Sequence, residues 1–122
     1  MKSLYDFYKI TCEKNSSNLL FSNGMTYSEG WSLIEKRGAF IRKIGCKKGD
    51  VIALLSPNSI EMCITFMAIT ATGAIVLPLD PNLDGKLYPE MLKKAGAKVV
   101  FTTPEFKKHF KDVKVYDLDL SK

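Results

Sequence analysis

Residues 49–81 decide the fold, and they read GDVIALLSPNSIEMCITFMAITATGAIVLPLDP. Between Val51 and Leu79, Glu61 is the only ionisable side chain apart from Cys63. Charged side chains are rarely buried, so a stretch of this length with a single carboxylate is expected in the core of the protein or inside a membrane.

Turn-forming residues divide this stretch into a strand, a helix and a second strand. Residues 51–55 are a short apolar run, typical of a strand buried on both faces. Ser59 or Asn58 can cap the following helix, and Gly73 suits the left-handed position just beyond its end. Residues 74–79 favour a strand again, so we expect a parallel strand, helix, strand unit. Apolar residues of this helix are Met62, Cys63, Phe66, Met67 and Ile69. They leave little polar face, which predicts a helix covered on nearly all sides.

A membrane-spanning helix over residues 60–79 is the alternative, because about 20 apolar residues cross a bilayer. The segment is interrupted by Thr65, Thr70, Thr72, Gly73 and Pro78. Its second half is also β-branched, which indicates a change of element in the middle. The interruptions favour the core unit, and we expect no membrane span.

The composition is that of one globular domain covering residues 1–122, with 46% hydrophobic and 25% charged residues. Cys12, Cys46 and Cys63 show no Cys-x-x-Cys spacing, so neither a disulfide framework nor a zinc site is indicated. Unpaired cysteines and an N-terminus that does not resemble a signal peptide favour the cytoplasm.

The net charge of +5 raises the question of nucleic-acid binding, because lysines are frequent in the last third of the chain. Acidic residues are interspersed among these lysines, and no recognition-helix or RNA-binding motif accompanies them. Lysine-rich faces commonly serve solubility. We therefore expect no nucleic-acid partner.

An amphipathic helix and a small β-hairpin precede the central unit. Ser3 can cap the helix, and Leu4, Phe7, Tyr8, Thr11 and Cys12 share one of its faces. Residues 19–27 predict the hairpin, because Asn23-Gly24 supplies the positive φ angles of a type I′ turn.

A second helix is expected to begin at a Ser28 cap and to end at Gly45. Gly30 and Gly38 weaken a helix, so we expect another backbone to approach closely at both positions. Arg37 lies inside the apolar arc, where we expect its side chain to extend to solvent.

After a loop at residues 80–85, the pattern predicts a helix that has Pro89 in its first turn and ends at Ala95-Gly96. A strand at 98–102, a short helix at 104–110 and a strand at 113–116 complete the chain. The fold class is therefore α/β: a mainly parallel sheet with helices on both faces, preceded by the N-terminal helix and the hairpin.

Few residues are candidates for chemistry. Ser56-Pro57-Asn58-Ser59 is the best-placed anion site, because it follows a parallel strand and begins a helix, but a capped helix start is the favoured interpretation. No glycine-rich phosphate loop is present, and Thr70-Ala71-Thr72-Gly73 is interpreted as packing. His109 is expected to make only a surface contact with Glu105. Cys63 is expected to be an inert core residue.

An ordered set of short motifs resembles the start of the adenylate-forming (AMP-binding) superfamily. The motifs are Thr26-Tyr27-Ser28-Glu29, Gly45 with Lys47-Lys48-Gly49-Asp50-Val51, Ser56-Pro57-Asn58-Ser59, Gly73-Ala74 with Pro78-Leu79-Asp80-Pro81, and Gly96-Ala97-Lys98. The resemblance covers residues 25–103, with a looser fit over 4–21. That superfamily includes acyl-CoA synthetases, aryl-CoA ligases, luciferases and the adenylation domains of peptide synthetases.

The resemblance implies, for a complete family member, ATP- and Mg²⁺-dependent activation of a carboxylic acid as acyl-adenylate, followed by transfer to coenzyme A. The family's phosphate loop ending Pro-Lys-Gly, its adenine-pocket and ribose-binding motifs and its catalytic lysine cannot be located in this sequence. The chain is therefore expected to be the N-terminal part of a longer ligase and inactive alone, with no catalytic, cofactor-binding or metal-binding residue of its own.

Two function classes remain open: a part of an acid:thiol ligase, for example in fatty acid metabolism, or a stand-alone α/β binding or regulatory module. The sequence identifies neither the acid nor the branch of the superfamily. An excised subdomain would expose apolar surface, so a homodimer is expected through Trp31, Ile34 and Ile41 or through the helix after Asn58.

Overall fold

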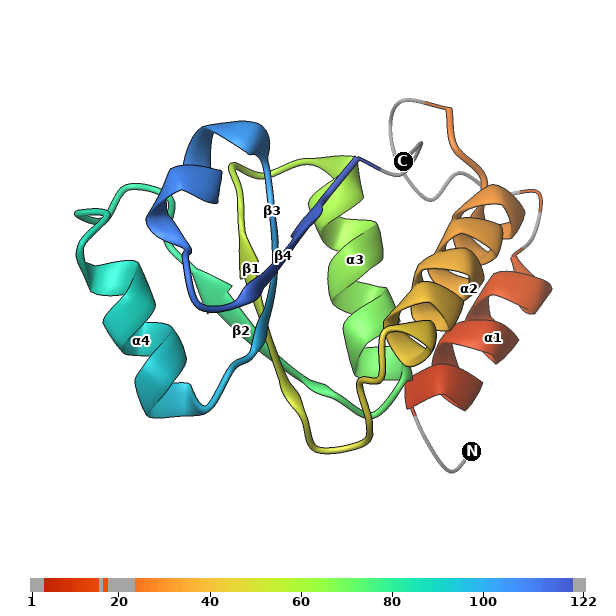
Figure 1. The fold of residues 1–122 in the computed structure, drawn as a ribbon. Coiled ribbons are helices and arrows are strands. Elements are labelled where there is room, and N and C mark those ends of the chain that lie inside the picture. The colour runs from red at the N-terminus through yellow and green to blue at the C-terminus, as the bar shows by residue number, and fades with distance from the viewer. Residues whose placement is uncertain (1–3, 16, 18–23, 120–122) are drawn as a thin grey trace.

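The computed structural model describes residues 4–15, 17 and 24–119 of the chain (Figure 1). In chain order the elements are α1 (Leu4–Lys14), α2 (Tyr27–Lys43), β1 (Val51–Leu55), α3 (Ile60–Ala71), β2 (Ile75–Leu79), α4 (Leu87–Ala95), β3 (Val99–Thr102), the 3₁₀ helix η1 (Pro104–His109) and β4 (Lys114–Asp117). None of the helices in these described ranges is long and apolar enough to cross a membrane.

The four strands form one parallel sheet in the order β2-β1-β3-β4. Val51 pairs with Ile75 of β2, and Ile52 pairs with Val99 of β3, so β1 lies between two neighbours. Because α3 ends at Ala71 and β2 begins at Ile75, the predicted strand, helix, strand unit is confirmed.

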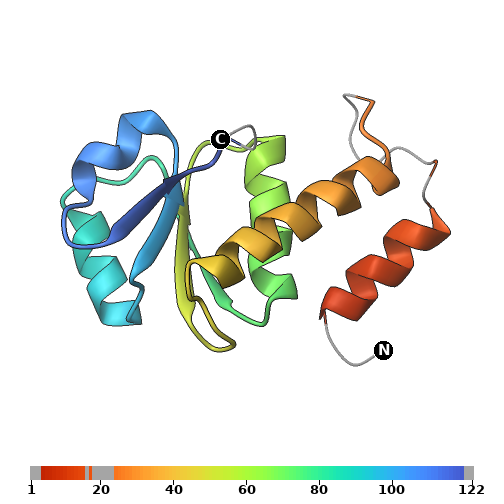
Figure 2. The ribbon, with the colours of Figure 1, turned by 45° about the vertical axis from the view of Figure 1, so that its right-hand side comes forward.

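Alternating side chains of β1 bury two separate cores, one on each face of the sheet. Ile52 and Leu54 pack with Ile34, Ile41 and other residues of α2 and α3, whereas Ala53 and Leu55 pack with residues of α4. Figures 1 and 2 show α2 and α3 on one side of the sheet, with α4 and η1 on the other. Helices therefore cover both faces, as the fold class required.

Helix α1 packs against the outer side of α2 and α3 rather than against the sheet. The Tyr8 hydroxyl and Thr70 Oγ1 lie 3.0 Å apart, within hydrogen-bond distance. The rings of Tyr5 and Trp31 have centroids 5.2 Å apart. The predicted N-terminal helix is thus present, and it adds a further layer to the α/β core.

Helix α3 begins as expected but is less buried than expected. Ser59 caps it, because Ser59 Oγ accepts a hydrogen bond of 3.1 Å from the Met62 amide. Only one side is buried, and Cys63 and Phe66 are exposed. The prediction that α3 is covered on nearly all sides is therefore wrong, because the described neighbours of α3 contact only part of its circumference.

The N-terminus of α2 differs from the prediction. Thr26, rather than Ser28, is the N-cap, and it forms a reciprocal capping box with Glu29. The Glu29 carboxyl accepts hydrogen bonds from the Thr26 amide and from the Thr26 hydroxyl, and these lower its pKa below the usual value. Tyr27 is consequently helical and does not belong to a hairpin strand. Gly24 has a φ of +98°, the positive angle that the predicted turn requires, whereas Asn23 and the predicted first strand, at 19–22, lie outside the described residues.

The predictions made for Gly38 and Gly73 have different outcomes. A Cβ atom at Gly38 would lie 3.6 Å from the Thr72 side chain, so the predicted approach of a second backbone is wrong at this position. Gly30 is buried, and the same expectation is untested there. Gly73 has a φ of +87°, which confirms the left-handed position after α3.

Arg37 is buried, with 8% of its surface exposed, and does not extend to solvent as predicted. Its guanidinium donates hydrogen bonds to the carbonyl oxygens of Asp117, at 3.2 Å, and Leu118, at 3.1 Å. It also lies over the Phe101 ring, 5.1 Å from the centroid. Burial lowers the pKa of this guanidinium, and the nearby Asp117 and Asp119 oppose that shift. Arg37 thus fastens the end of β4 to α2.

We expect Arg37→Ala to lower the free energy of unfolding by about 3 kcal/mol, because it removes buried contacts and leaves two carbonyl groups without their donor. Arg37→Lys should cost about 1–2 kcal/mol, since lysine cannot reproduce the planar two-pronged contact. Urea unfolding monitored by circular dichroism measures both effects. The matched control is Lys36→Ala at the exposed neighbouring position. Equal stabilities of the Arg37 and Lys36 variants would contradict this assignment.

Candidate functional site

The carboxyl ends of the four parallel strands meet at one edge of the sheet, where open α/β sheets bind ligands. The loops after β1 and β2 enclose a cavity of about 600 Å³ at this edge. Its lining is Ser56, Pro57, Asn58, Met62, Pro78, Leu79, Asp80, Pro81, Asn82 and Phe106. The anion site predicted at residues 56–59 therefore lies beside a cavity, and its chemistry can be tested against these residues.

Three polar side chains at this edge, those of Ser56, Ser59 and Asp80, are engaged in shaping the loops. Ser56 is 2% exposed, and its hydroxyl donates to the Pro57 carbonyl at 2.8 Å. Ser59 Oγ accepts from the helix backbone, and Asp80 Oδ1 accepts from the Asn82 amide at 2.9 Å. These contacts are those of a capped helix start and a tight turn.

The lining residues do not fit the phosphates of ATP. The cavity wall has no lysine or arginine among the described residues, and Asp80 adds a carboxylate that would repel a polyphosphate. No cluster of three or more metal-ligating side chains occurs in residues 4–15, 17 and 24–119. The described residues at this edge therefore do not support a step of ATP chemistry.

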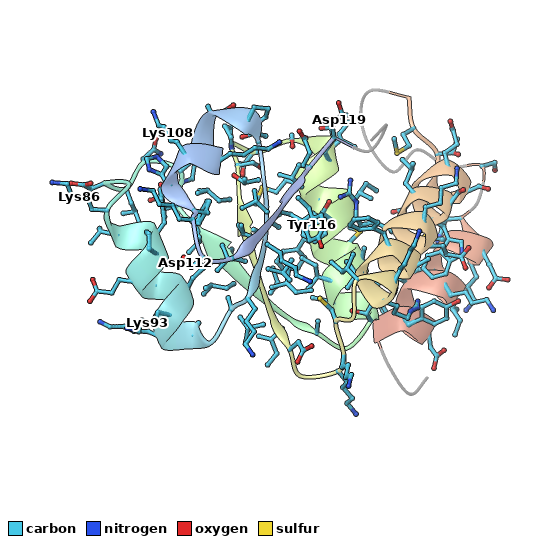
Figure 3. All side chains as sticks on the ribbon, in the orientation of Figure 1. Lys86, Lys93, Lys108, Asp112, Tyr116 and Asp119 are labelled. Atoms are coloured by element: carbon cyan, nitrogen blue, oxygen red, sulfur yellow. The ribbon has the colours of Figure 1, made fainter. Side chains whose placement is uncertain are left out.

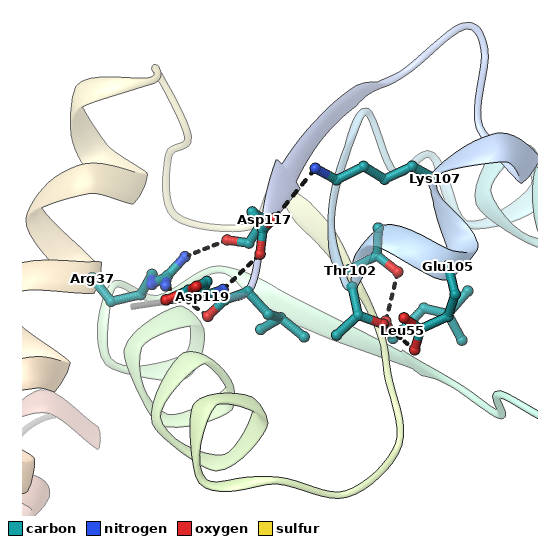
Figure 4. Close-up of polar contacts among 9 residues, drawn as sticks. Arg37, Leu55, Thr102, Glu105, Lys107, Asp117 and Asp119 are labelled. Carbon is teal, nitrogen blue, oxygen red and sulfur yellow. Dashed lines mark hydrogen bonds and ion pairs between the residues drawn. The ribbon is translucent and has the colours of Figure 1, made fainter. Parts of the chain in front are cut away.

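A buried hydrogen bond bridges the point where the strand order reverses, between β1 and β3. Thr102 Oγ1 donates to the Leu55 carbonyl at 2.7 Å, and Thr102 is fully buried (Figure 4). Next to it, Thr103 Oγ1 donates to Glu105 at 2.8 Å. A crevice at this point is a common ligand site in doubly wound folds. In this chain the Thr102 side chain, at the end of β3, instead joins β3 to β1.

A charged group at the end of β4 was not predicted from the sequence. Lys107 Nζ lies 3.3 Å from Asp117 Oδ2, and the Asp119 amide donates to Asp117 Oδ1 at 2.8 Å (Figure 4). Together with Arg37, these residues join α2, η1 and β4. The signal in the sequence was an arginine inside the apolar arc of α2, which requires a partner when it is buried.

His109 packs against aromatic rings and has no placed acid or base partner in the described chain. Its ring centroid lies 5.6 Å from that of Tyr88 and 6.4 Å from that of Phe106. Glu105 instead accepts the hydrogen bond from Thr103, so the predicted contact between His109 and Glu105 is replaced by ring packing. This arrangement offers no general acid or base.

The three cysteines are free, and their environments differ. Burial raises the pKa of the Cys12 thiol. Burial and the nearby Asp50 carboxylate raise the pKa of the Cys46 thiol, which Lys114 partly offsets. Cys63 is exposed, so the prediction of an inert core thiol is wrong: its side of α3 faces solvent.

Cys63 should therefore react first with a thiol reagent at neutral pH. A raised pKa keeps Cys12 and Cys46 protonated, and the thiolate is the reactive form, so their modification should be at least about tenfold slower. Ellman's reagent follows the time course, and mass spectrometry of peptides assigns the sites. Cys63→Ser should abolish the fast phase, while Cys46→Ser should retain it. A fast phase that survives Cys63→Ser would refute the assignment.

This chain with a parallel α/β fold matches a known protein family. The model of the AMP-binding enzyme family matches residues 12–121. The chain belongs to that family.

Relatives and solved structures agree with this membership. The long-chain-fatty-acid–CoA ligase FadD13 of Mycobacterium tuberculosis is 34% identical over 76 residues, 62% of this chain and 15% of that protein. The 4-coumarate–CoA ligase of Pinus taeda is 30% identical over 92 residues, 75% of this chain and 17% of that protein. The chain thus spans less than a fifth of these relatives.

The fold matches N-terminal domains of known structure. A crystal structure of the N-terminal domain of FACL13 from Mycobacterium tuberculosis has a TM-score of 0.87 at 23% identity, over 99% of this chain and 35% of that one. The N-terminal subdomain of NpsA from Klebsiella oxytoca, in complex with 3-hydroxybenzoyl-AMSN, has a TM-score of 0.81 at 21% identity, over 97% and 30%. At these identities the match shows the fold alone.

Proposed function

We propose that the chain forms the first α/β unit of an AMP-forming acid:thiol ligase. The observation that carries the proposal is the family match over residues 12–121, together with CoA ligases among the relatives. In the proposed reaction a carboxylate attacks the α-phosphate of ATP, pyrophosphate leaves, and the thiol of coenzyme A then displaces AMP from the acyl-adenylate. The identity of the substrate acid is not determined, since a fatty-acid ligase, a 4-coumarate ligase and bacitracin synthase 1 are all similar to this chain.

Within this proposal the chain supplies a scaffold and no reacting group. The hydroxyls of Ser56, Ser59 and Thr102 at the carboxyl edge all bond to the chain's own backbone. ATP, Mg²⁺ and coenzyme A would then be bound by other parts of the ligase, and the three unpaired cysteines favour a cytoplasmic location.

The purified chain should release no pyrophosphate above a protein-free blank when it is mixed with ATP, Mg²⁺ and a panel of fatty and aryl acids. The physical reason is that the candidate cavity has no cationic group for a phosphate. Exchange of radiolabelled pyrophosphate into ATP is the measurement, with FadD13 of Mycobacterium tuberculosis as the positive control. Acid-dependent exchange by the chain alone would overturn the scaffold role.

Whether the chain is part of a longer ligase can be tested separately by reading the gene sequence. A phosphate-loop segment ending Pro-Lys-Gly, encoded in frame after Lys122, supports the ligase. A stop codon directly after Lys122 would count against it and favour a stand-alone binding or regulatory module.

We also propose that the isolated chain self-associates, but through another surface than Trp31, Ile34 and Ile41. Ile34 and Ile41 are buried against α3 and the sheet, so they offer no free surface. Phe7 and Ile10 on α1 are exposed, and so is Phe66, one turn before the Thr70 that contacts Tyr8. These apolar side chains form the surface for a second copy.

Sedimentation velocity across a concentration series should show a dimer that Phe66→Ser dissociates, because the substitution removes apolar area from the contact. Leu83→Ser, at an exposed apolar position in another part of the chain, is the matched control and should retain the dimer. A monomer at all concentrations, without binding of a hydrophobic dye, would contradict self-association.

A further inference from the structure

A second cavity, of about 570 Å³, lies on the α4 side of the sheet, near the start of β3 and β4. Its apolar wall comes from Pro89 and Leu92 of α4, from Ala97 before β3, and from Phe110 and Val113 before β4. Because the strands are parallel, their amino ends lie at the opposite edge from the cavity beside Ser56. We call this apolar cavity, which the proposed ligase chemistry does not use, the α4 cavity.

His109 forms a fixed part of the wall of the α4 cavity. Its ring is held by Tyr88 and Phe106, and the absence of a side chain at Gly85 leaves the room it occupies. A Cβ atom added at Gly85 would overlap the imidazole of His109. The wall is therefore packed in place before any ligand arrives, which lowers the ordering cost of binding.

Cations surround the mouth of this cavity. Lys93, Lys98 and Lys111 line it, and all three are exposed. Of the two acidic residues in the lining, Glu90 lies 3.6 Å from Lys94, which leaves Asp112 opposite three lysines. Figure 3 shows Lys93 on α4 and Asp112 at the turn that leads into β4. The mouth thus carries an excess of positive charge over an apolar interior.

We propose that the α4 cavity binds a small amphipathic carboxylate. The apolar body of the ligand lies on Pro89 and Val113, over the buried Leu92 and Phe110, and its carboxylate meets Lys98 and Lys111 at the mouth. A volume of about 570 Å³ is within the range of small-molecule sites, which combine an apolar lining with a few polar groups that orient the ligand. An ammonium group pairs with a carboxylate by a charge-assisted hydrogen bond. This site requires neither ATP nor a catalytic residue, so it goes beyond the proposed ligase role.

Titration of the full chain with decanoate, followed by ¹H–¹⁵N NMR, tests the site. We expect saturable shifts at the amides of Leu92, Ala97 and Val113. Decanol, which has the same chain without the charge, should bind the same residues about tenfold more weakly. Shifts confined to the exposed Phe7 and Phe66 region, or no saturable shifts, would overturn the proposal.

Charge reversal separates the lysines of the mouth from general electrostatics. The double variant Lys98→Glu with Lys111→Glu should weaken decanoate at least about tenfold and change decanol by less than about twofold. The control Lys9→Glu with Lys43→Glu makes the same change in net charge at exposed positions on α1 and α2 and should leave both affinities unchanged. Equal weakening by the two double variants would show that no site-specific contact exists.

Filling the cavity is an independent check. Val113 is half-buried in the wall, so Val113→Phe should place its ring in the ligand volume and abolish binding of both decanoate and decanol. Circular dichroism establishes that each variant is folded. Unchanged decanoate affinity in a folded Val113→Phe variant would place the ligand elsewhere and refute the assignment.

Discussion

The burial of β1 on both faces is the constraint on which the rest of this structure depends. Residues 52–55 are fully buried and carry no polar side chain, so neither face of the strand can meet water. Each buried leucine or isoleucine contributes about 1.5–3 kcal/mol, which is realised only when both faces are covered. Burial of these four residues therefore requires the neighbouring strands, helices α2 and α3 on one face of the sheet and α4 on the other.

The sequence was sufficient where local patterns decide structure. The stretch with Glu61 as its one carboxylate predicted β1, α3 and β2 to within a residue or two, and Ser59 and Gly73 marked the ends of α3. It was insufficient where distant segments meet. Arg37 was expected at the surface because its partners, the carbonyls of Asp117 and Leu118, lie some 80 positions later. The sequence periodicity of α2 contains no information on that contact.

The candidate site was predictable in position but not in chemistry. Parallel topology places residues 56–59 at the carboxyl edge from sequence alone, but only the structure shows where the hydroxyls of Ser56 and Ser59 bond. These two hydroxyls bond to the backbone, where they stabilise the loop and the start of α3. A fold shared with ligases thus does not by itself supply ligase chemistry, which depends on specific side chains.

Exposed apolar surface occurs in this chain in two physically different forms. Phe7, Ile10 and Phe66 are exposed on α1 and α3, outside any cavity described above, where they offer apolar area to a protein surface. The apolar residues of the α4 cavity are concave and bordered by lysines. An exposed apolar patch gains free energy from any apolar partner of similar area, whereas a concave site with positive charge at its mouth favours a ligand that is apolar at one end and anionic at the other. This difference in shape and charge is the reason that we propose a second copy of the chain for the first surface and a small acid for the second.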